Sequence, residues 1–194
     1  MGSTSSLRVR NPQLAGASLP GSGCKEGRIR RDCLYWTVMG FFNYVLLSDV
    51  HSMQVIEDPC GMLACLQEAV AEYPQPLRQA ILERFVAEAR FWPNSFHYVS
   101  AVERADVIYT TDIVQQVVQA VIQVIFALNG VYSPGEKKLA QTLGRLAVQP
   151  EQFVPRVQAL LYPGIEASVE RLREQRQALV RLVTDVEECV IRNA

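Results

Sequence analysis

The feature that most constrains the fold is a long apolar stretch between about Asp106 and Val131, which is rich in valine and isoleucine. These residue types favour strands, but about 25 residues is too long for a strand of a globular protein. The apolar residues also recur at intervals of three and four, as on one face of a helix: Val114, Val117, Val118, Val121, Ile122, Ile125 and Leu128. We therefore expect one long, buried helix here.

Four polar residues of the same stretch form a second regular pattern. Asp112, Gln116, Gln119 and Gln123 also step by three and four, so they share one helix face. This polar stripe could line a ligand groove, lie beneath the basic N-terminal segment, or face solvent. The solvated face needs no further assumption and is the simplest interpretation.

Shorter helical patterns lie on both sides of the long helix. We expect helices from about Asp58 to Val70, Pro76 to Phe91 and Ser95 to Arg104, and over residues 134–147, 150–161 and 163–192. Asp58 is a suitable N-cap for the first, with Pro59 at its first helical position. The predicted fold class is therefore all-α, an antiparallel helical bundle over residues 58–194 with a disordered or irregular N-terminal segment.

The last predicted helix carries an apolar seam with a 4-3 spacing. Its members are Ile165, Val169, Leu172, Leu179, Val183, Val186 and Val190, and Arg176 occupies the missing position. Such a seam can form a coiled-coil dimer. Packing onto the chain's own bundle is the simpler alternative.

The N-terminal part differs in composition from the rest of this 194-residue chain. Residues 1–33 are rich in Ser, Gly, Pro and Arg and read as a disordered basic tail. Residues 1–31 carry a net charge of +5, which leaves −6 for the remainder. A basic tail can contact nucleic acid, but a solvated tail is the simpler interpretation. Residues 34–57 are aromatic and β-branched, which indicates an irregular or short β segment.

Cysteine and histidine usage indicates a cytoplasmic protein without a metal site. The five cysteines are odd in number and contain no Cys-x-x-Cys pair, which is typical of reduced thiols. Only two histidines are present, so zinc is not expected. There is no signal peptide pattern, and the apolar segment Cys33–Leu47 is too short to span a membrane.

The corner between Phe126 and Leu139 carries the most specific pattern. The Asn129-Gly130 pair suits the end of the long helix. Lys137 and Lys138 are then expected in the first turn of the helix that restarts at Pro134. Cations are unfavourable at a helix N-terminus unless an anion lies there, so the lysines suit a bound phosphate. A chance placement, partly compensated by Glu136, is the alternative.

Three segments resemble the helical domain that follows the catalytic domain in nucleotidyltransferases of the polymerase-beta superfamily. They are Asp58-Pro59-Cys60-Gly61-Met62-Leu63, Ala89-Arg90-Phe91-Trp92, and Phe126-Ala-Leu-Asn-x-x-Tyr132-x-Pro134-Gly135-x-Lys137. The resemblance covers about residues 54–162. It implies that Lys137 contacts nucleotide triphosphate, with Tyr132 and Lys138 nearby.

The catalytic motifs of that superfamily are missing. Its chemistry needs a Gly-Ser turn for phosphate and an Asp-x-Asp pair for magnesium. The nearest segments here place Phe41 where the serine belongs and His51 where the second aspartate belongs. We therefore predict no catalytic and no metal residue in this chain.

The functional prediction is a truncated or non-catalytic nucleotidyltransferase-like domain. It would bind a nucleotide, a small substrate or a catalytic partner, and ATP with magnesium only together with that partner. Neither a membrane nor nucleic acid is an expected partner. The alternative is a structural protein that forms a helical homodimer through the C-terminal helix.

A ribonuclease is a further alternative, because small helical ribonuclease domains related in fold use an Arg followed by a His. Arg90-x6-His97 fits the permitted spacing. Pro93 and Asn94 fall between the two residues, however, and a helix break there would separate their side chains.

Overall fold

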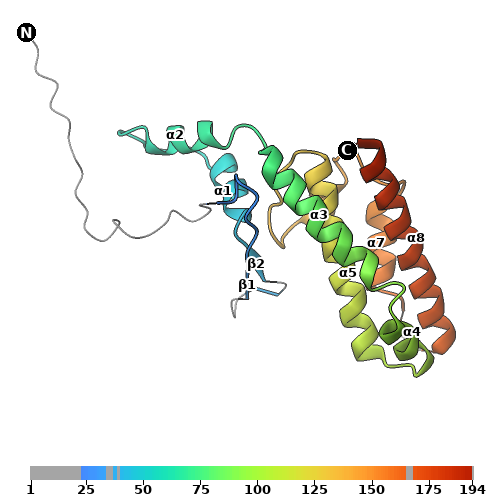
Figure 1. Ribbon diagram of the computed structural model, residues 1–194. Helices are drawn as coiled ribbons and strands as arrows, with labels where there is room; N and C mark the ends of the chain where they lie inside the picture. The colour runs from blue at the N-terminus through green and yellow to red at the C-terminus, as the bar shows by residue number, and fades with distance from the viewer. Residues whose placement is uncertain (1–22, 34–36, 39, 165–167, 194) are drawn as a thin grey trace, which may run out of the picture.

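The computed structural model describes residues 23–33, 37–38, 40–164 and 168–193 and is predominantly helical (Figure 1). Its elements in chain order are β1 (Arg31–Asp32), β2 (Phe41–Phe42), α1 (Val45–Ser52), α2 (Met62–Ala69), α3 (Gln75–Phe91), α4 (Phe96–Glu103), α5 (Val107–Leu128), α6 (Leu139–Leu143), α7 (Phe153–Leu161) and α8 (Val169–Asn193). The predicted all-α class is confirmed. Helices α3, α5, α7 and α8 lie side by side, and α4 closes one end.

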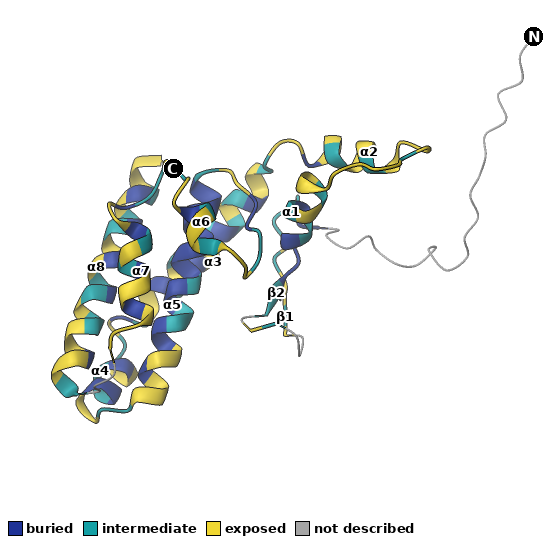
Figure 2. Cartoon of the chain, turned by 180° about the vertical axis from the view of Figure 1, so that it is seen from behind, coloured by how far each residue is buried: buried dark blue, intermediate teal, exposed yellow. Residues whose placement is uncertain are grey.

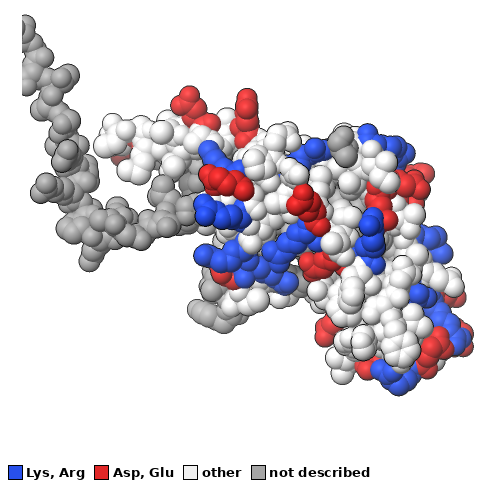
Figure 3. Space-filling model, viewed as in Figure 1, with Lys and Arg blue, Asp and Glu red and all other residues white. Residues whose placement is uncertain are grey.

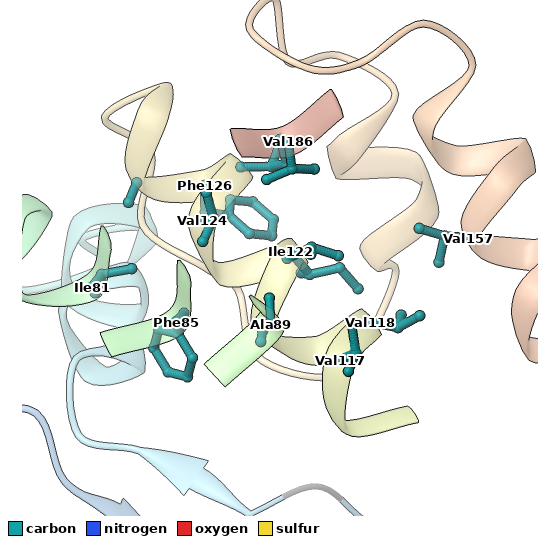
Figure 4. Packing of buried hydrophobic residues seen from close by; sticks show 14 of the residues in the cluster. Ile81, Phe85, Ala89, Val117, Val118, Ile122, Val124, Phe126, Val157 and Val186 are labelled. Carbon is teal, nitrogen blue, oxygen red and sulfur yellow. The ribbon is translucent and has the colours of Figure 1, made fainter. Parts of the chain in front are cut away.

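The predicted long helix, α5, forms the centre of the bundle. Asp106 accepts a hydrogen bond from the Tyr109 backbone N–H and caps its start. Fourteen of its 22 residues are buried, because α3, α4, α7 and α8 all pack against it. Figure 4 shows α3 residues such as Phe85 facing α5 on one side, and Val157 of α7 and Val186 of α8 on another. Burial on several sides explains why nearly every turn of α5 is apolar.

The apolar seam of α8 packs onto the chain's own bundle. Leu172, Leu179, Val183 and Val186 are buried against neighbouring helices. Arg176, at the missing seam position, donates a hydrogen bond through Nε to the Pro93 backbone oxygen at 2.9 Å. Ile165 lies outside the described residues. Most of the described seam is therefore already used within the bundle.

The prediction of a disordered tail is wrong for residues 23–33. The Cys24 side chain is fully buried. The Asn43 side chain donates to the Arg28 backbone oxygen at 3.0 Å and accepts from the Arg30 backbone N–H at 2.9 Å. Local composition could not reveal these contacts, because their partners come from later in the chain. The rest of the predicted tail, residues 1–22, lies outside the described residues.

The segment 34–57, for which an irregular or short β structure was expected, contains both a strand and a helix among its described residues. Strand β2 pairs antiparallel with β1, but residues Val45–Ser52 form helix α1. Val45 and Leu47 of α1 are buried in the core. A short apolar run does not distinguish helix from strand, so burial against the bundle decided the conformation here. We call the described residues between 23 and 69, which contain β1, β2, α1 and α2, the N-terminal unit.

Helix α2 begins later than predicted and lies outside the core (Figure 2). Pro59 belongs to a preceding turn, and the helix starts at Met62. Asp58 still acts as a cap, because its carboxylate accepts hydrogen bonds from the backbone N–H groups of Met62 and Ala64 at 2.9 and 3.0 Å. None of the eight residues of α2 is buried, and α1 is the described element that packs against it most closely. Of its expected apolar face, only Val70, just after the helix, reaches the core.

By length and composition alone, α5 is the one described helix that could cross a membrane. Within its most apolar window, 72% of the residues are buried inside the protein. The core helix of a soluble protein has the same properties, so α5 is weak evidence for a membrane. The cytoplasmic location stays a prediction.

Candidate functional site

The corner after α5 differs from its predicted form in one important respect. Helix α6 begins at Leu139, whereas we expected a helix from Pro134 onward. Gly135 and Lys138 both have left-handed backbone conformations, with φ values of 85° and 58°. A right-handed helix cannot run through such residues. The two lysines therefore precede a five-residue helix and do not lie in its first turn, which removes the argument from the helix N-terminus.

The end of α5 agrees with the prediction. Asn129 is its C-cap residue, and the chain turns at Gly130. The Asn129 side chain donates to the backbone oxygens of Ile125 and Val148, both at 2.8 Å, and accepts from the Val148 N–H at 2.9 Å. Asn129 thus fixes the later loop around Val148 to the end of α5.

The three predicted ligand residues have different surroundings. Lys137 is exposed and lines a cavity, whereas Lys138 is exposed outside its lining. Tyr132 is buried, and its hydroxyl donates to the Glu72 backbone oxygen at 3.1 Å. Its ring lies 4.8 Å from the Tyr73 ring and 5.8 Å from the His51 ring, centroid to centroid. Burial raises the pKa of both Tyr132 and Tyr73. The structure brings only Lys137 to the cavity.

This cavity, which we call the lysine cavity, has a volume of about 310 Å³. Its walls come from the β2 region, α1, the middle of α5 and the 133–137 loop. Gln119 and Gln123 of α5 and Asp49 of α1 supply polar groups, and Phe41 and Phe42 supply apolar surface. Ligand pockets in proteins commonly combine apolar and aromatic surface with a few polar groups in this way.

Ser133 is the least expected member of the lysine cavity. It is 3% exposed, and its hydroxyl has no hydrogen-bond partner in the described part of the chain. Buried hydroxyl groups are normally paired, because an unpaired one costs about 1–3 kcal/mol. The sequence placed Ser133 in the turn but offered no signal for this role. A bound ligand or water could supply the missing partner.

A second cavity adjoins the first. It has a volume of about 280 Å³ and lies between the β strands, α3 and α5. Phe42 and Gln119 line both cavities. We call it the arginine cavity, because Arg31 and Arg84 contribute to its lining. Figure 3 shows Lys and Arg side chains gathered over this part of the surface.

The polar stripe of α5 lines the two cavities, contrary to the simplest interpretation of its pattern. Asp112, Gln116 and Gln119 line the arginine cavity, and Gln119 and Gln123 line the lysine cavity. Gln116 donates through Nε2 to Glu88 at 3.0 Å. Gln123 is 5% exposed and accepts a hydrogen bond of 2.8 Å from the Tyr44 hydroxyl. The stripe thus forms the α5 side of both cavities.

Phe42, which lines both cavities, contacts two arginines and a tyrosine. The guanidinium carbons of Arg31 and Arg84 lie 5.6 and 5.9 Å from its ring centroid. The Tyr44 ring stacks on it at 5.3 Å. Burial raises the pKa of Tyr44 well above its usual range, against an opposing effect of the Arg84 charge. Tyr44 therefore remains a neutral hydrogen-bond donor to Gln123 at physiological pH.

The residues of the metal and ribonuclease patterns do not come together to form a site. Asp49 lines the lysine cavity, but His51 packs against Tyr132. No three His, Cys, Asp or Glu side chains of the described residues are grouped to hold a metal ion. Arg90 of the ribonuclease pattern donates through Nε to Glu187 at 2.6 Å, which raises the Arg90 pKa. The predicted break after α3 also separates Arg90 from α4, where His97 lies.

A comparison with protein families identifies one match. A family model described as a domain of unknown function, DUF4037, matches residues 42–139. The match runs from β2 to the first residue of α6 and so contains most of the lining of both cavities. No curated protein and no solved structure matches the chain. Because the model matches half of its length, the chain belongs to the DUF4037 family, whose function is unknown.

Proposed function

We propose that this chain is the ligand-binding helical domain of a nucleotidyltransferase-like system. In this proposal the lysine cavity binds a phosphate-bearing nucleotide or small substrate, and the catalytic groups belong to a partner. The observation that carries it is the convergence of Lys137, Ser133 and two α5 glutamines on one cavity. The resemblance of the 126–137 segment to the helical domain of these enzymes gives the cavity its expected ligand.

The chemistry of the cavity fits a phosphate next to a polar organic group. Lys137 forms no ion pair with a described carboxylate, so its ammonium group is available to an anion. The unpaired Ser133 hydroxyl adds a donor. Charge-assisted hydrogen bonds to phosphate are about twice as strong as neutral ones. The amide groups of Gln119 and Gln123 can bond a base or sugar edge.

The described residues do not fit a magnesium site, since no suitable cluster of ligands exists among them. The proposal therefore assigns magnesium and phosphoryl chemistry to a separate catalytic domain. A surface suited to such a partner lies on and before α2. Met53, Val55, Ile56 and Met62 are each at least half exposed there. Exposed apolar residues mark an interaction surface when they form a contiguous patch.

This surface also includes the position at which, by the resemblance, a catalytic domain would join the helical domain. Ile56 is 95% exposed and lies two residues before Asp58-Pro59, where the catalytic part would join. An open reading frame upstream with Gly-Ser and Asp-x-Asp motifs is the expected source of the partner. Its absence, together with a lack of any co-purifying nucleotidyltransferase, would count against the partner proposal.

Calorimetric titration of the chain with ATP in the absence of magnesium tests the ligand proposal, because the proposal assigns magnesium to the partner. We expect binding to the unaltered chain at millimolar ATP or below, and a roughly tenfold or greater loss in Lys137→Gln. Lys138→Gln is the matched control, because the neighbouring lysine is exposed but lies outside the cavity. No heat at millimolar ATP, or equal affinities for both variants, would contradict the proposal.

A further inference from the structure

We propose that the arginine cavity binds the zwitterionic head of a small molecule, for which a free α-amino acid is the simplest example. This goes beyond the nucleotide proposal, because Lys137 does not line this cavity and the nucleotide is not needed for it. The shared residues Phe42 and Gln119 would place the two ligands next to each other. The chain would then hold the amino acid beside the nucleotide, where it could accept a group transferred from that nucleotide.

The positive side of the cavity suits a carboxylate. Arg31 and Arg84 come from β1 and α3, and both guanidinium groups lie within 6 Å of the Phe42 ring centroid. Two guanidinium groups near the same ring can share one carboxylate of a ligand. Arg84 is exposed and forms no ion pair with a described residue. Its planar group can bind a carboxylate through two parallel hydrogen bonds.

The negative side suits an ammonium group. Glu88 of α3 and Asp112 of α5 line the same cavity. Gln116 donates to one Glu88 oxygen and fixes this carboxylate toward α5. Two cationic and two anionic side chains thus line one cavity. A ligand with one charge would meet a repulsive group as well as an attractive one, whereas a zwitterion can satisfy both.

The size and remaining lining are also consistent with a small ligand. The volume of about 280 Å³ is below the range of drug-sized sites, which begins near 300 Å³. Phe42, Phe85 and Ala120 provide apolar surface for a short side chain. Gln115, Gln116 and Gln119 surround it with amide groups. These contacts favour a compact molecule with a charged head over an extended polymer.

The test uses the full chain labelled with ¹⁵N and individual L-amino acids at 10 mM as probes. We expect at least one amino acid to shift the side-chain amide signals of Gln116 and Gln119 in a saturable manner. Its N-acetyl derivative and its amide, each of which lacks one charge, should bind at least tenfold more weakly. Inorganic phosphate should bind no better than those two derivatives.

Substitutions of lining residues test whether the amino acid binds in the arginine cavity. Arg84→Gln and Asp112→Asn should each weaken the amino acid at least fivefold while leaving the remaining spectrum intact. Arg181→Gln, an exposed arginine on α8, is the control for loss of a surface charge and should have no effect. Lys137→Gln should also have no effect, which separates this inference from the nucleotide proposal.

The inference is overturned if none of the twenty amino acids binds at 10 mM. It is also overturned if the singly charged derivatives or phosphate bind as tightly as the amino acid, or if Arg84→Gln and Asp112→Asn bind it normally.

Discussion

Helices α5 and α2 are both rich in apolar residues, yet they have opposite surroundings. Fourteen of the 22 residues of α5 are buried, whereas none of the eight residues of α2 is. Helix α5 contacts α3, α4, α7 and α8. Helix α2 packs on α1 alone among the described elements that it contacts closely. Apolar content therefore did not decide burial in this chain; the number of available neighbours did.

The comparison extends to the two regions that contain these helices. The bundle supplies most of the core, and the N-terminal unit adds Phe42, Tyr44, Val45 and Leu47 to it through contacts with the bundle. Those contacts include the buried hydrogen bond between Tyr44 and Gln123 and the close approach of Gly27 to Pro76 and Ala80 of α3. Both cavities lie where the two regions meet. The attachment of the N-terminal unit therefore determines whether the candidate site exists.

The same leucine-to-alanine change should separate the two regions most clearly. Leu179 of α8 is fully buried, whereas Leu66 of α2 is 36% exposed. Leu179→Ala should lower the free energy of unfolding by about 2–5 kcal/mol, and Leu66→Ala by less than about 1 kcal/mol. Urea unfolding followed by circular dichroism measures both. Equal losses would show that α2 is covered in solution.

Gly27 tests the contact between the N-terminal unit and α3. Its φ is 81°, and an added Cβ would lie 2.8 Å from the Pro76 backbone oxygen. Gly27→Ala should therefore cost about 2–4 kcal/mol, from backbone strain and overpacking together. Gly61→Ala is the matched control, because Gly61 also has a positive φ of 63° but has nothing within 4 Å. A similar loss of unfolding free energy in both variants would contradict the contact.

Two buried tyrosines test the hydrogen bond between the regions. Tyr44 and Tyr98 are 1% and 0% exposed, but only the Tyr44 hydroxyl has a described partner. Tyr44→Phe should lower the free energy of unfolding by about 1–3 kcal/mol, because it leaves Gln123 unpaired. Tyr98→Phe should be neutral or stabilising. Unfolding curves that rank the two variants in the reverse order would contradict this assignment.

Alkaline pH should give the smallest effect of the series. Burial raises the pKa of Tyr98 in the bundle to about 12, above an unfolded value of about 10. As the pH rises, Tyr98 loses its hydroxyl proton first in the unfolded chain. The stability that the protonated Tyr98 contributes is therefore complete below about pH 10 and is lost as the pH rises toward 12. Tyr98→Phe should therefore reduce the loss of unfolding free energy between pH 9 and 11 by about 1 kcal/mol. Urea unfolding at both pH values checks it, and an unchanged loss would exclude a role for Tyr98.

The long periodic helices could be predicted from the sequence. Helices α3, α5 and α8 lie close to their expected positions, and the end of α5 at Asn129 was also expected. Each spans several turns, so the repeated spacing of apolar residues identifies both the helix and its buried face. Of the candidate site, the sequence indicated Lys137 and the residues of the polar stripe, but not that Lys137 shares a cavity with Gln119 and Gln123.

The errors fall on short segments whose conformation depends on distant partners. Lys137 and Lys138 were expected within a helix, but Gly135 and Lys138 have left-handed conformations. The neighbouring Glu136 accepts a hydrogen bond from the Val38 backbone, 98 residues earlier in the chain. No local pattern contains that contact. The positions of Ser133 and Arg84 at the cavities were missed for the same reason, since their neighbours come from other elements.

The sequence by itself determined that this chain forms a helical bundle around one long apolar helix, because helix periodicity is a local property repeated over many turns. The tertiary structure alone decided that the polar stripe of α5 becomes the wall of two cavities. That outcome depends on the N-terminal unit docking beside α5 through Tyr44 and Gln123. A stripe of glutamines has the same spacing on a solvated face and in a groove, and only the element packed against it distinguishes the two.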